Sequence, residues 1–220
     1  MRQHPQHSKQ INLPPGFLTK VAQKLYRALN HKDATTRFVG GCVRDAVLGH
    51  TPADLDVATT LSPENATETL QQEGFKVVPT GLDHGTLTAM QEKETFEVTT
   101  LRRDEHTDGR HATVAFTTDF RQDAARRDFT FNALFMDNTG QITDYFGGLD
   151  DLSTGRVRFV GAPAKRLAED WLRALRYVRF YGRFGTTPPD EQTFAALADA
   201  APELQNLSAE RITTEVLKTM

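Results

Sequence analysis

The apolar pattern of the chain changes near residue 160, and this change restricts the fold more than any other feature of the sequence. Before it, short β-prone runs alternate with helical stretches, and after it no strand pattern appears. The β-prone runs are 38–41, 55–60, 85–90, 95–101, 112–116, 142–146 and 157–161, and helical spacing covers 17–30, 63–73, 121–128, 163–185 and 191–219. The sequence therefore predicts an α/β domain followed by an all-α region.

The same change of pattern indicates how the 220 residues are divided. We expect an α/β domain over 1–150, with a mixed sheet and helices, and an all-α region over 151–220. Residues 1–15 are rich in Gln, His and Pro, and we expect them to form a loose leader. A chain of this length can bury one large core or two modest ones.

Charge and cysteine content exclude several classes of protein. With 26 Lys and Arg against 29 Asp and Glu, the net charge of -3 excludes a uniformly basic nucleic-acid coat but allows a local basic patch. The single Cys42 excludes an intramolecular disulfide and a zinc site with two or more thiolates. Neither a bilayer-spanning run nor a signal-peptide segment is evident. We expect a soluble cytoplasmic protein with no membrane partner, and an organellar location stays open.

Two carboxylates stand one residue apart in a predicted strand. Because side chains alternate along a strand, Asp54 and Asp56 project from one face, about 6.6 Å apart, while Leu55 and Val57 enter the core. Like charges on one face repel unless a cation lies between them, and oxygen ligands favour Mg²⁺ or Mn²⁺. Glu97, on the polar face of a second predicted strand, completes a three-carboxylate cup if the strands are neighbours. The alternative is that these acidic residues are solvated surface groups.

A strand, a glycine turn and a helix start are predicted around Gly40 and Gly41. Two glycines let backbone N–H groups approach an anion closely, and Arg44 would offer a forked donor to phosphate. The spacing matches neither Walker A nor G-x-G-x-x-G, which disfavours a P-loop or a Rossmann site. The alternative is a plain turn with an exposed arginine. Further along, Arg126 and Arg127, with Asn132 nearby, are either solvated charges or a clamp for a triphosphate and a ribose.

The helix predicted near 165–182 has an apolar face and a polar face. The apolar face holds Leu167, Trp171, Leu175 and Val178, and the polar face holds Asp170, Arg173, Arg176 and Tyr177. Between 165 and 183, six basic residues stand against two acidic ones, and such a basic stripe suits phosphate groups. The alternative is an ion-paired surface helix in which Asp170 and Arg173 pair at i,i+3 spacing.

Taken together, these blocks resemble the tRNA nucleotidyltransferase and poly(A) polymerase family, specifically a class II CCA-adding enzyme of the polymerase β superfamily. The resemblance covers the head and neck regions of the family, in order, from about Phe38 to Glu215. Its blocks are FVGGCVRDAVLG, DLDVATT, FEVTTLRRDEHTDGRH, RRDFTFNALF, DYFGGLDDLSTGRVRFVG, EDWLRALRYVRFYGRFG and ERITTE. The resemblance implies a polymerase-β-like nucleotidyltransferase head followed by an all-α neck that selects nucleotides and binds RNA.

The resemblance also implies roles for the candidate residues. Asp54 and Asp56 would bind the catalytic metal, Mg²⁺ or Mn²⁺, with Glu97 as the third catalytic carboxylate. Asp170 and Arg173 stand in the family's E-D-x-x-R motif and would read the base edge. The other nucleotide-binding positions would be Gly41, Arg44, Arg127, Asn132, Arg176 and Arg179. The segment 102–111 matches a mobile loop linked to the switch from C to A addition.

The implied reaction is template-independent addition of C and A (CCA) to the 3′ end of tRNA from CTP and ATP, with release of pyrophosphate. The sequence leaves three alternatives open: a poly(A) polymerase, an enzyme that adds only CC or only A to tRNA, and a non-catalytic RNA-binding module. The three carboxylates argue against the last, because a binding module has no need of a metal cup. Family members commonly continue into two more helical regions, and homo-oligomer formation stays open.

Overall fold

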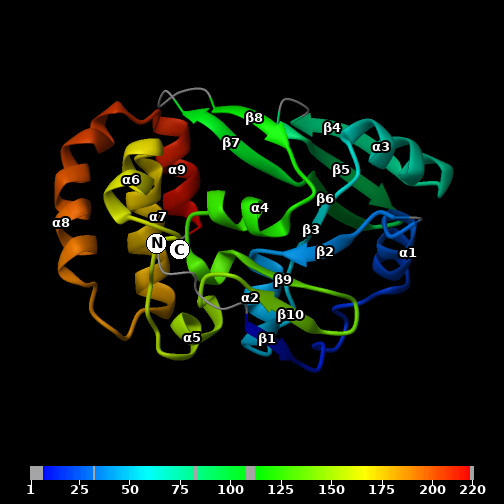
Figure 1. The fold of residues 1–220 in the computed structure, drawn as a ribbon, viewed down its shortest axis with the longest axis horizontal. Coiled ribbons are helices and arrows are strands. Elements are labelled where there is room, and N and C mark those ends of the chain that lie inside the picture. The colour runs from blue at the N-terminus through cyan, green and yellow to red at the C-terminus, as the bar shows by residue number, and fades with distance from the viewer. Residues whose placement is uncertain (1–6, 32, 82–83, 108–111, 219–220) are drawn as a thin grey trace.

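The computed structural model describes residues 7–31, 33–81, 84–107 and 112–218 (Figure 1). Its larger part is built on an eight-stranded mixed sheet in the order β1-β10-β9-β2-β3-β6-β5-β4, and β7 and β8 form a separate pair. The strands are β1 (His7–Gln10), β2 (Thr36–Val39), β3 (Leu55–Thr59), β4 (Lys76–Gly81), β5 (Thr86–Gln91), β6 (Glu94–Thr100), β7 (Arg102–Thr107), β8 (Ala112–Phe116), β9 (Leu134–Met136) and β10 (Gln141–Asp144).

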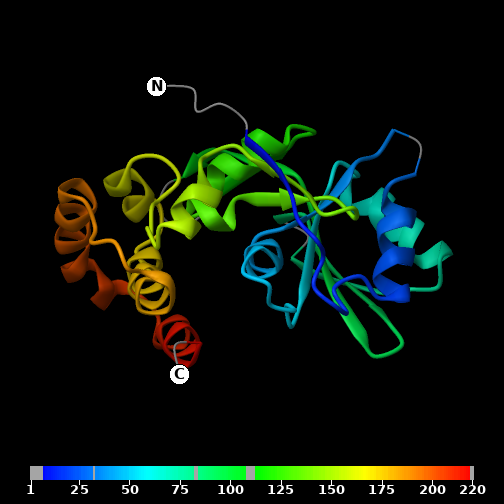
Figure 2. The same ribbon diagram turned by 90° about the horizontal axis from the view of Figure 1, so that it is seen from below.

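The helices fall into two groups. They are α1 (Lys20–Leu29), α2 (Gly41–Val47), α3 (Pro63–Gln72), α4 (Phe120–Arg126), η2 (Thr130–Asn132), α5 (Gly148–Ser153), α6 (Pro163–Glu169), α7 (Leu172–Phe184), α8 (Glu191–Ala200), η3 (Ala201–Asn206) and α9 (Ala209–Leu217). Figures 1 and 2 show α6 to α9 gathered at the end of the molecule opposite α1 and α3. The predicted order, an α/β domain and then an all-α region, is confirmed.

Strands β3 and β6 form a parallel pair in the interior of the sheet. Leu55 lies opposite Phe96, and Asp56 lies opposite Glu97. Because side chains alternate along a strand, Leu55 and Phe96 are buried on one face of the sheet while the two carboxylates share the other. The prediction that these two strands are neighbours is confirmed.

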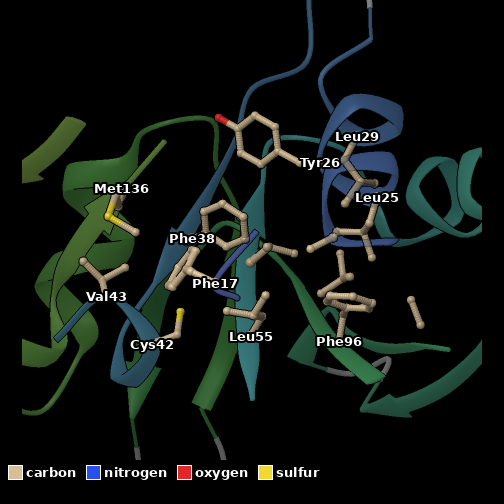
Figure 3. Packing of buried hydrophobic residues seen from close by; sticks show 14 of the residues in the cluster. Phe17, Leu25, Tyr26, Leu29, Phe38, Cys42, Val43, Leu55, Phe96 and Met136 are labelled. Atoms are coloured by element: carbon tan, nitrogen blue, oxygen red, sulfur yellow. The ribbon is translucent and has the colours of Figure 1, made fainter. Parts of the chain in front are cut away.

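The apolar face of this sheet is covered by α1 and α3. Thr19 begins α1 by accepting a hydrogen bond from the Ala22 N–H (3.0 Å). Figure 3 shows Leu25 and Leu29 projecting from α1 toward the sheet, and both are completely buried in the same core cluster as Phe38. The predicted helix over 17–30 is thus present with a shorter start, and its apolar stripe anchors it on the sheet.

A cluster of aromatic rings joins the all-α region to the sheet domain. Phe129 and Phe131, which lie before β9, are buried together with Phe159, Tyr177 and Phe180. The ring centroid of Phe129 lies 4.9 Å from that of Phe159 and 5.3 Å from that of Phe180. The boundary expected at residue 150 falls inside α5 and crosses this shared core, so the division into head and neck stays a proposal.

The helix predicted over 163–185 is interrupted at Asp170. This residue has extended backbone angles (φ -160°, ψ 107°), so α6 ends at Glu169 and α7 begins at Leu172. The Asp170 carboxylate accepts a hydrogen bond from the Leu172 N–H (3.1 Å), which favours a new helix start over continuation. The predicted faces are also wrong within α7, because its buried face is formed by Ala174, Tyr177 and Phe180: Tyr177 is 4% exposed, whereas Val178 is 65% exposed.

Two strand predictions also differ from the structure. His7–Gln10 pair with β10 as β1, so the prediction of a loose leader is wrong for these four residues. The sheet edge at β10 offers unpaired backbone groups, and these residues satisfy them. The run 157–161 contributes only an isolated bridge between Phe129 and Phe159, with one backbone hydrogen bond on each side, from the Thr130 N–H to the Arg158 carbonyl and from the Val160 N–H to the Asp128 carbonyl.

The C-terminal helix predicted over 191–219 is divided into α8, η3 and α9. Pro202 stands in the first turn of η3, where it lacks the N–H that a continuous α-helix requires. Of the segment 102–111, residues 102–107 form β7, and 108–111 lie outside the described residues.

Candidate active site

A pocket of about 440 Å³ lies where α2, the segment before β3 and α7 meet. It gathers eight of the predicted site residues, which are Gly41, Arg44, Asp54, Asp56, Arg127, Asn132, Arg176 and Arg179. Three predicted residues, Glu97, Asp170 and Arg173, lie outside its lining. A larger cavity of about 870 Å³ between α1 and α3 contains none of the predicted residues. The smaller pocket is therefore the candidate active site.

The carboxylates of the site come from the middle of β6 and from the start of β3. Asp56 lies opposite Glu97, and Asp54 stands just before β3. Burial raises the pKa of Asp56 to about 6; the negative charges of Glu97 and Asp54 add to this rise, and the positive charge of Arg127 opposes it. Asp56 therefore lies close enough to Glu97 and Asp54 to be repelled by both.

These carboxylates have the chemistry of a divalent-cation site. Among the described residues, no three His, Cys, Asp or Glu side chains stand close enough together to hold a metal ion. Burial and the neighbouring negative charges of Glu97 and Asp54 raise the pKa of Asp56, and a bound cation would offset that repulsion. Carboxylate oxygens such as those of Asp54 and Asp56 are the ligands that Mg²⁺ and Mn²⁺ prefer. The residues present therefore fit a divalent cation.

We expect Asp56→Asn to stabilise the metal-free protein at neutral pH. The pKa of Asp56 is raised from 3.8 to about 6 on folding, so its contribution to stability is present at low pH and is lost as the pH rises through about 6. The neutral amide avoids this loss, and we expect a gain of about 1–2 kcal/mol in the free energy of unfolding at pH 7.5. Urea unfolding in the presence of EDTA measures it.

The gain should disappear near pH 4, where the carboxyl of Asp56 is protonated in the folded protein. Asp54→Asn is the matched control, because Asp54 is exposed and its charge is well solvated. A loss of stability in Asp56→Asn at pH 7.5 would contradict the prediction.

The turn at Gly40 brings the backbone close to the side chain of Arg127. Gly40 has φ 74° and ψ -128°, a conformation that side chains other than glycine rarely adopt. A Cβ atom at this position would lie 3.3 Å from Nη1 of Arg127 and 3.7 Å from the backbone oxygen of Asn132. The predicted order of strand, turn and helix is confirmed by β2, Gly40 and α2.

Gly40→Ala is expected to weaken nucleotide binding and to lower stability by about 1–3 kcal/mol, because it strains the backbone and displaces the Arg127 guanidinium. Urea unfolding and titration with CTP measure the two effects. Gly49→Ala is the control, because Gly49 also has a positive φ (79°) but nothing lies within 4 Å of an added Cβ. Equal CTP binding in both variants would contradict a role for the close approach.

Each arginine of the pocket is held by a carboxylate that the sequence reasoning did not select. The pairs are Arg44 with Asp45, Arg127 with Asp123, Arg176 with Asp128 and Arg179 with Glu215, at N–O distances of 2.8, 3.0, 2.5 and 2.5 Å. Burial acts to raise the pKa of Asp128, but the charge of Arg176 and hydrogen bonds from Asn132 and Arg176 lower it overall. These carboxylates thus hold the four arginine side chains in place before any ligand binds.

A sequence signal for some of these partners exists. Asp45 directly follows Arg44, and Asp123 precedes Arg127 by one helical turn, whereas Asp128 and Glu215 pair with arginines far away in the sequence. Arg44 itself is 6% exposed, so the alternative of an exposed arginine is wrong. It also donates to the side-chain oxygen of Asn132 (2.9 Å), which joins two predicted nucleotide-binding residues.

The two residues predicted to read the base edge do not pair with each other. Arg173 pairs with Glu169 (2.6 Å), and Asp170 pairs with Arg211 of α9 (2.9 Å). The predicted i,i+3 side-chain pair is therefore wrong, because Asp170 lies in the break between two helices. The direct link between them is a backbone hydrogen bond from the Arg173 N–H to the Asp170 carbonyl (3.1 Å).

Comparison with known proteins gives the same assignment for both parts of the chain. Residues 36–158 match the family model of the poly A polymerase head domain, and residues 188–220 match that of a probable RNA- and SrmB-binding site of polymerase A. The mitochondrial CCA tRNA nucleotidyltransferase 1 of Homo sapiens is 45% identical over 91% of this chain and 46% of its own length. The CCA-adding enzyme of Oceanobacillus iheyensis is 45% identical over 82% of this chain and 44% of its own length.

A solved structure shares the fold as well. The CCA-adding enzyme of Bacillus stearothermophilus, solved in complex with CTP, superposes with a TM-score of 0.79 at 36% identity, over 90% of this chain and 47% of that one. The fold is thus a polymerase-β-like nucleotidyltransferase head followed by helices. The chain belongs to the poly A polymerase head domain family. It spans about half the length of the relatives it matches.

Proposed function

We propose that this chain adds C and A nucleotides to the 3′ end of tRNA from CTP and ATP, without a nucleic-acid template, and releases pyrophosphate. The observation that carries the proposal is the parallel register that sets Asp56 opposite Glu97 beside a pocket lined by arginines. Nucleotidyl transfer requires carboxylates that hold a cation and, next to them, guanidinium groups that bind the phosphates. The names of the relatives support tRNA as the acceptor.

In this proposal Asp54 and Asp56 hold a divalent cation, Mg²⁺ or Mn²⁺, which nucleotidyltransferases of this family generally use. When bound, such a cation lowers the pKa of an attacking hydroxyl and stabilises charge on the triphosphate. Glu97 is the third catalytic carboxylate and adds negative charge beside Asp56.

We assign nucleotide binding to the residues of the pocket that offer N–H donors. We assign the phosphates to guanidinium groups and backbone N–H groups, because these present forked or closely spaced donors. The residues are Gly41, Arg44, Arg127, Arg176 and Arg179, with Asn132 next to the sugar. Asp170 and Arg173, outside the pocket lining, would read the base edge once a nucleotide reaches them.

The test is addition of single nucleotides to tRNA that lacks its CCA end. We expect CTP alone to add two residues, ATP to add one after them, and UTP and GTP to add none, as read by sequencing the products. The Asp56→Asn variant is the control for contaminating activity. Long tails from ATP alone would instead establish a poly(A) polymerase, a function that the description of the head family favours as the second candidate.

Partners and location follow from the proposed reaction. The partners are tRNA, CTP and ATP, and sedimentation of the chain with and without tRNA tests whether it forms a homo-oligomer. None of the helices in the described part of the chain is long and apolar enough to cross a bilayer. Three relatives are named as mitochondrial and others are bacterial, so we propose either the cytoplasm or an organelle matrix, which cell fractionation decides.

A further inference from the structure

The charges that line the active-site pocket nearly cancel. Of the described residues that line it, five are cationic and four are acidic. The cations are Arg44, Arg127, Arg176, Arg179 and Lys218, and the acidic residues are Asp45, Asp54, Asp56 and Asp128. A nucleoside triphosphate carries several negative charges, so a pocket of this composition needs positive charge that is not already neutralised.

The four arginines do not supply that charge in full, because each forms a short ion pair. Arg176 and Arg179 are typical. Arg176 pairs with Asp128 and lies 3.7 Å from Glu215, and Arg179 pairs with Glu215 at 2.5 Å. Their remaining N–H groups can still donate to a ligand, but the charge of each guanidinium is largely balanced by its buried carboxylate. The arginines can therefore orient a bound phosphate group, but they contribute little net positive charge to the pocket.

Lys218 is different from the other cations of the pocket. It directly follows α9, and its backbone (φ -72°, ψ -10°) continues the helical path. It stands three residues after Glu215 and so lies on the same side of the helix, one turn further along. Glu215 faces Arg176 and Arg179, and this placement agrees with Lys218 forming part of the pocket lining.

Within the described residues, the exposed Lys218 side chain has neither an ion-pair partner nor a hydrogen-bond acceptor. An ammonium group on a flexible stem can follow a phosphate group, whereas a guanidinium already paired on two sides cannot move far. α9 packs against α7, the helix that carries Arg176 and Arg179, so Lys218 reaches the site from a separate element (Figure 1).

We propose that Lys218 binds the phosphate groups of the incoming nucleoside triphosphate. The proposal rests on the proposed function and adds a residue to it. The pocket volume of about 440 Å³ matches one small-molecule ligand rather than a length of RNA, which is why we assign Lys218 to the nucleotide. In the free protein it is the pocket cation whose charge is available, and the paired arginines orient the phosphates around it.

The experiment compares Lys218→Gln with the unchanged chain in titrations with CTP and with inorganic tripolyphosphate, by calorimetry at low ionic strength. We expect the dissociation constant of both probes to rise about tenfold, the usual weight of one charge-assisted hydrogen bond. At saturating CTP the rate of addition should change little, so that the effect appears in KM. Lys218→Arg should restore most of the affinity, because it restores the charge.

Lys165→Gln is the matched control, since Lys165 is exposed on α6 and lies outside the pocket lining. Unchanged affinity for both probes in Lys218→Gln would overturn the proposal, and so would a raised KM for tRNA with unchanged CTP binding, which would assign Lys218 to the RNA backbone. If the unchanged chain binds neither CTP nor tripolyphosphate, the proposed function itself fails. The two failures are therefore distinguishable.

Discussion

Asp56→Ala is expected to abolish addition of both C and A, with a loss of at least about 10³-fold in the rate at saturating nucleotide. The substitution removes a carboxylate that lines the pocket and lies opposite Glu97, so the proposed cation loses a central ligand. Nucleotide binding should survive in part, because the pocket arginines keep their own carboxylate partners. Single-turnover addition of CMP to tRNA lacking its CCA end, with Mg²⁺ present, measures the loss.

Asp56→Asn separates chemistry from folding in the same assay. It should lose activity to a similar extent although it is expected to stabilise the metal-free fold, so unfolding cannot explain the loss. Glu97→Gln should also impair addition, by a smaller factor, because Glu97 lies outside the pocket lining. Full activity in either Asp56 variant with Mg²⁺ present would remove the metal assignment from these residues.

The parts of the site that could be predicted from the sequence are those set by local pattern. Strand alternation placed Leu55 in the core and Asp56 on the opposite face, and β3 confirms this. The paired glycines predicted a turn between strand and helix, and Gly40 with its positive φ forms it. In both cases the decisive forces act within a few residues, so the sequence contains the information directly.

The parts that could not be predicted depend on residues far apart in the chain. The arginine that pairs with Asp170 is 41 residues away on α9, and the carboxylate that holds Arg176 is 48 residues away. Helical periodicity continues on both sides of Asp170, so it predicts one helix where the structure has two. The Asp170 carboxylate accepts a hydrogen bond from the Leu172 N–H at the start of α7, and hydrophobic spacing contains no information about this polar contact.

Asp170→Ala is expected to relax discrimination against UTP and GTP by about 1–3 kcal/mol, the usual weight of a good contact to a base edge. An ionised carboxylate only accepts hydrogen bonds. C and A present an amino donor where U and G present a carbonyl acceptor, so a carboxylate there attracts the first pair and repels the second. Addition of each nucleotide alone, at matched concentrations, gives the ratio of efficiencies for the variant and the unchanged chain.

Arg211→Ala distinguishes base reading from a structural role for Asp170. Arg211 donates to both carboxylate oxygens of Asp170, at 3.0 and 2.9 Å, so an incoming base has to compete with it. If the ion pair were the whole role of Asp170, loss of either partner would relax discrimination equally. If Asp170 reads the base, Arg211→Ala keeps the preference for C and A while Asp170→Ala loses it. Unchanged preference in Asp170→Ala would leave a nucleotidyltransferase in which this residue serves only to start α7.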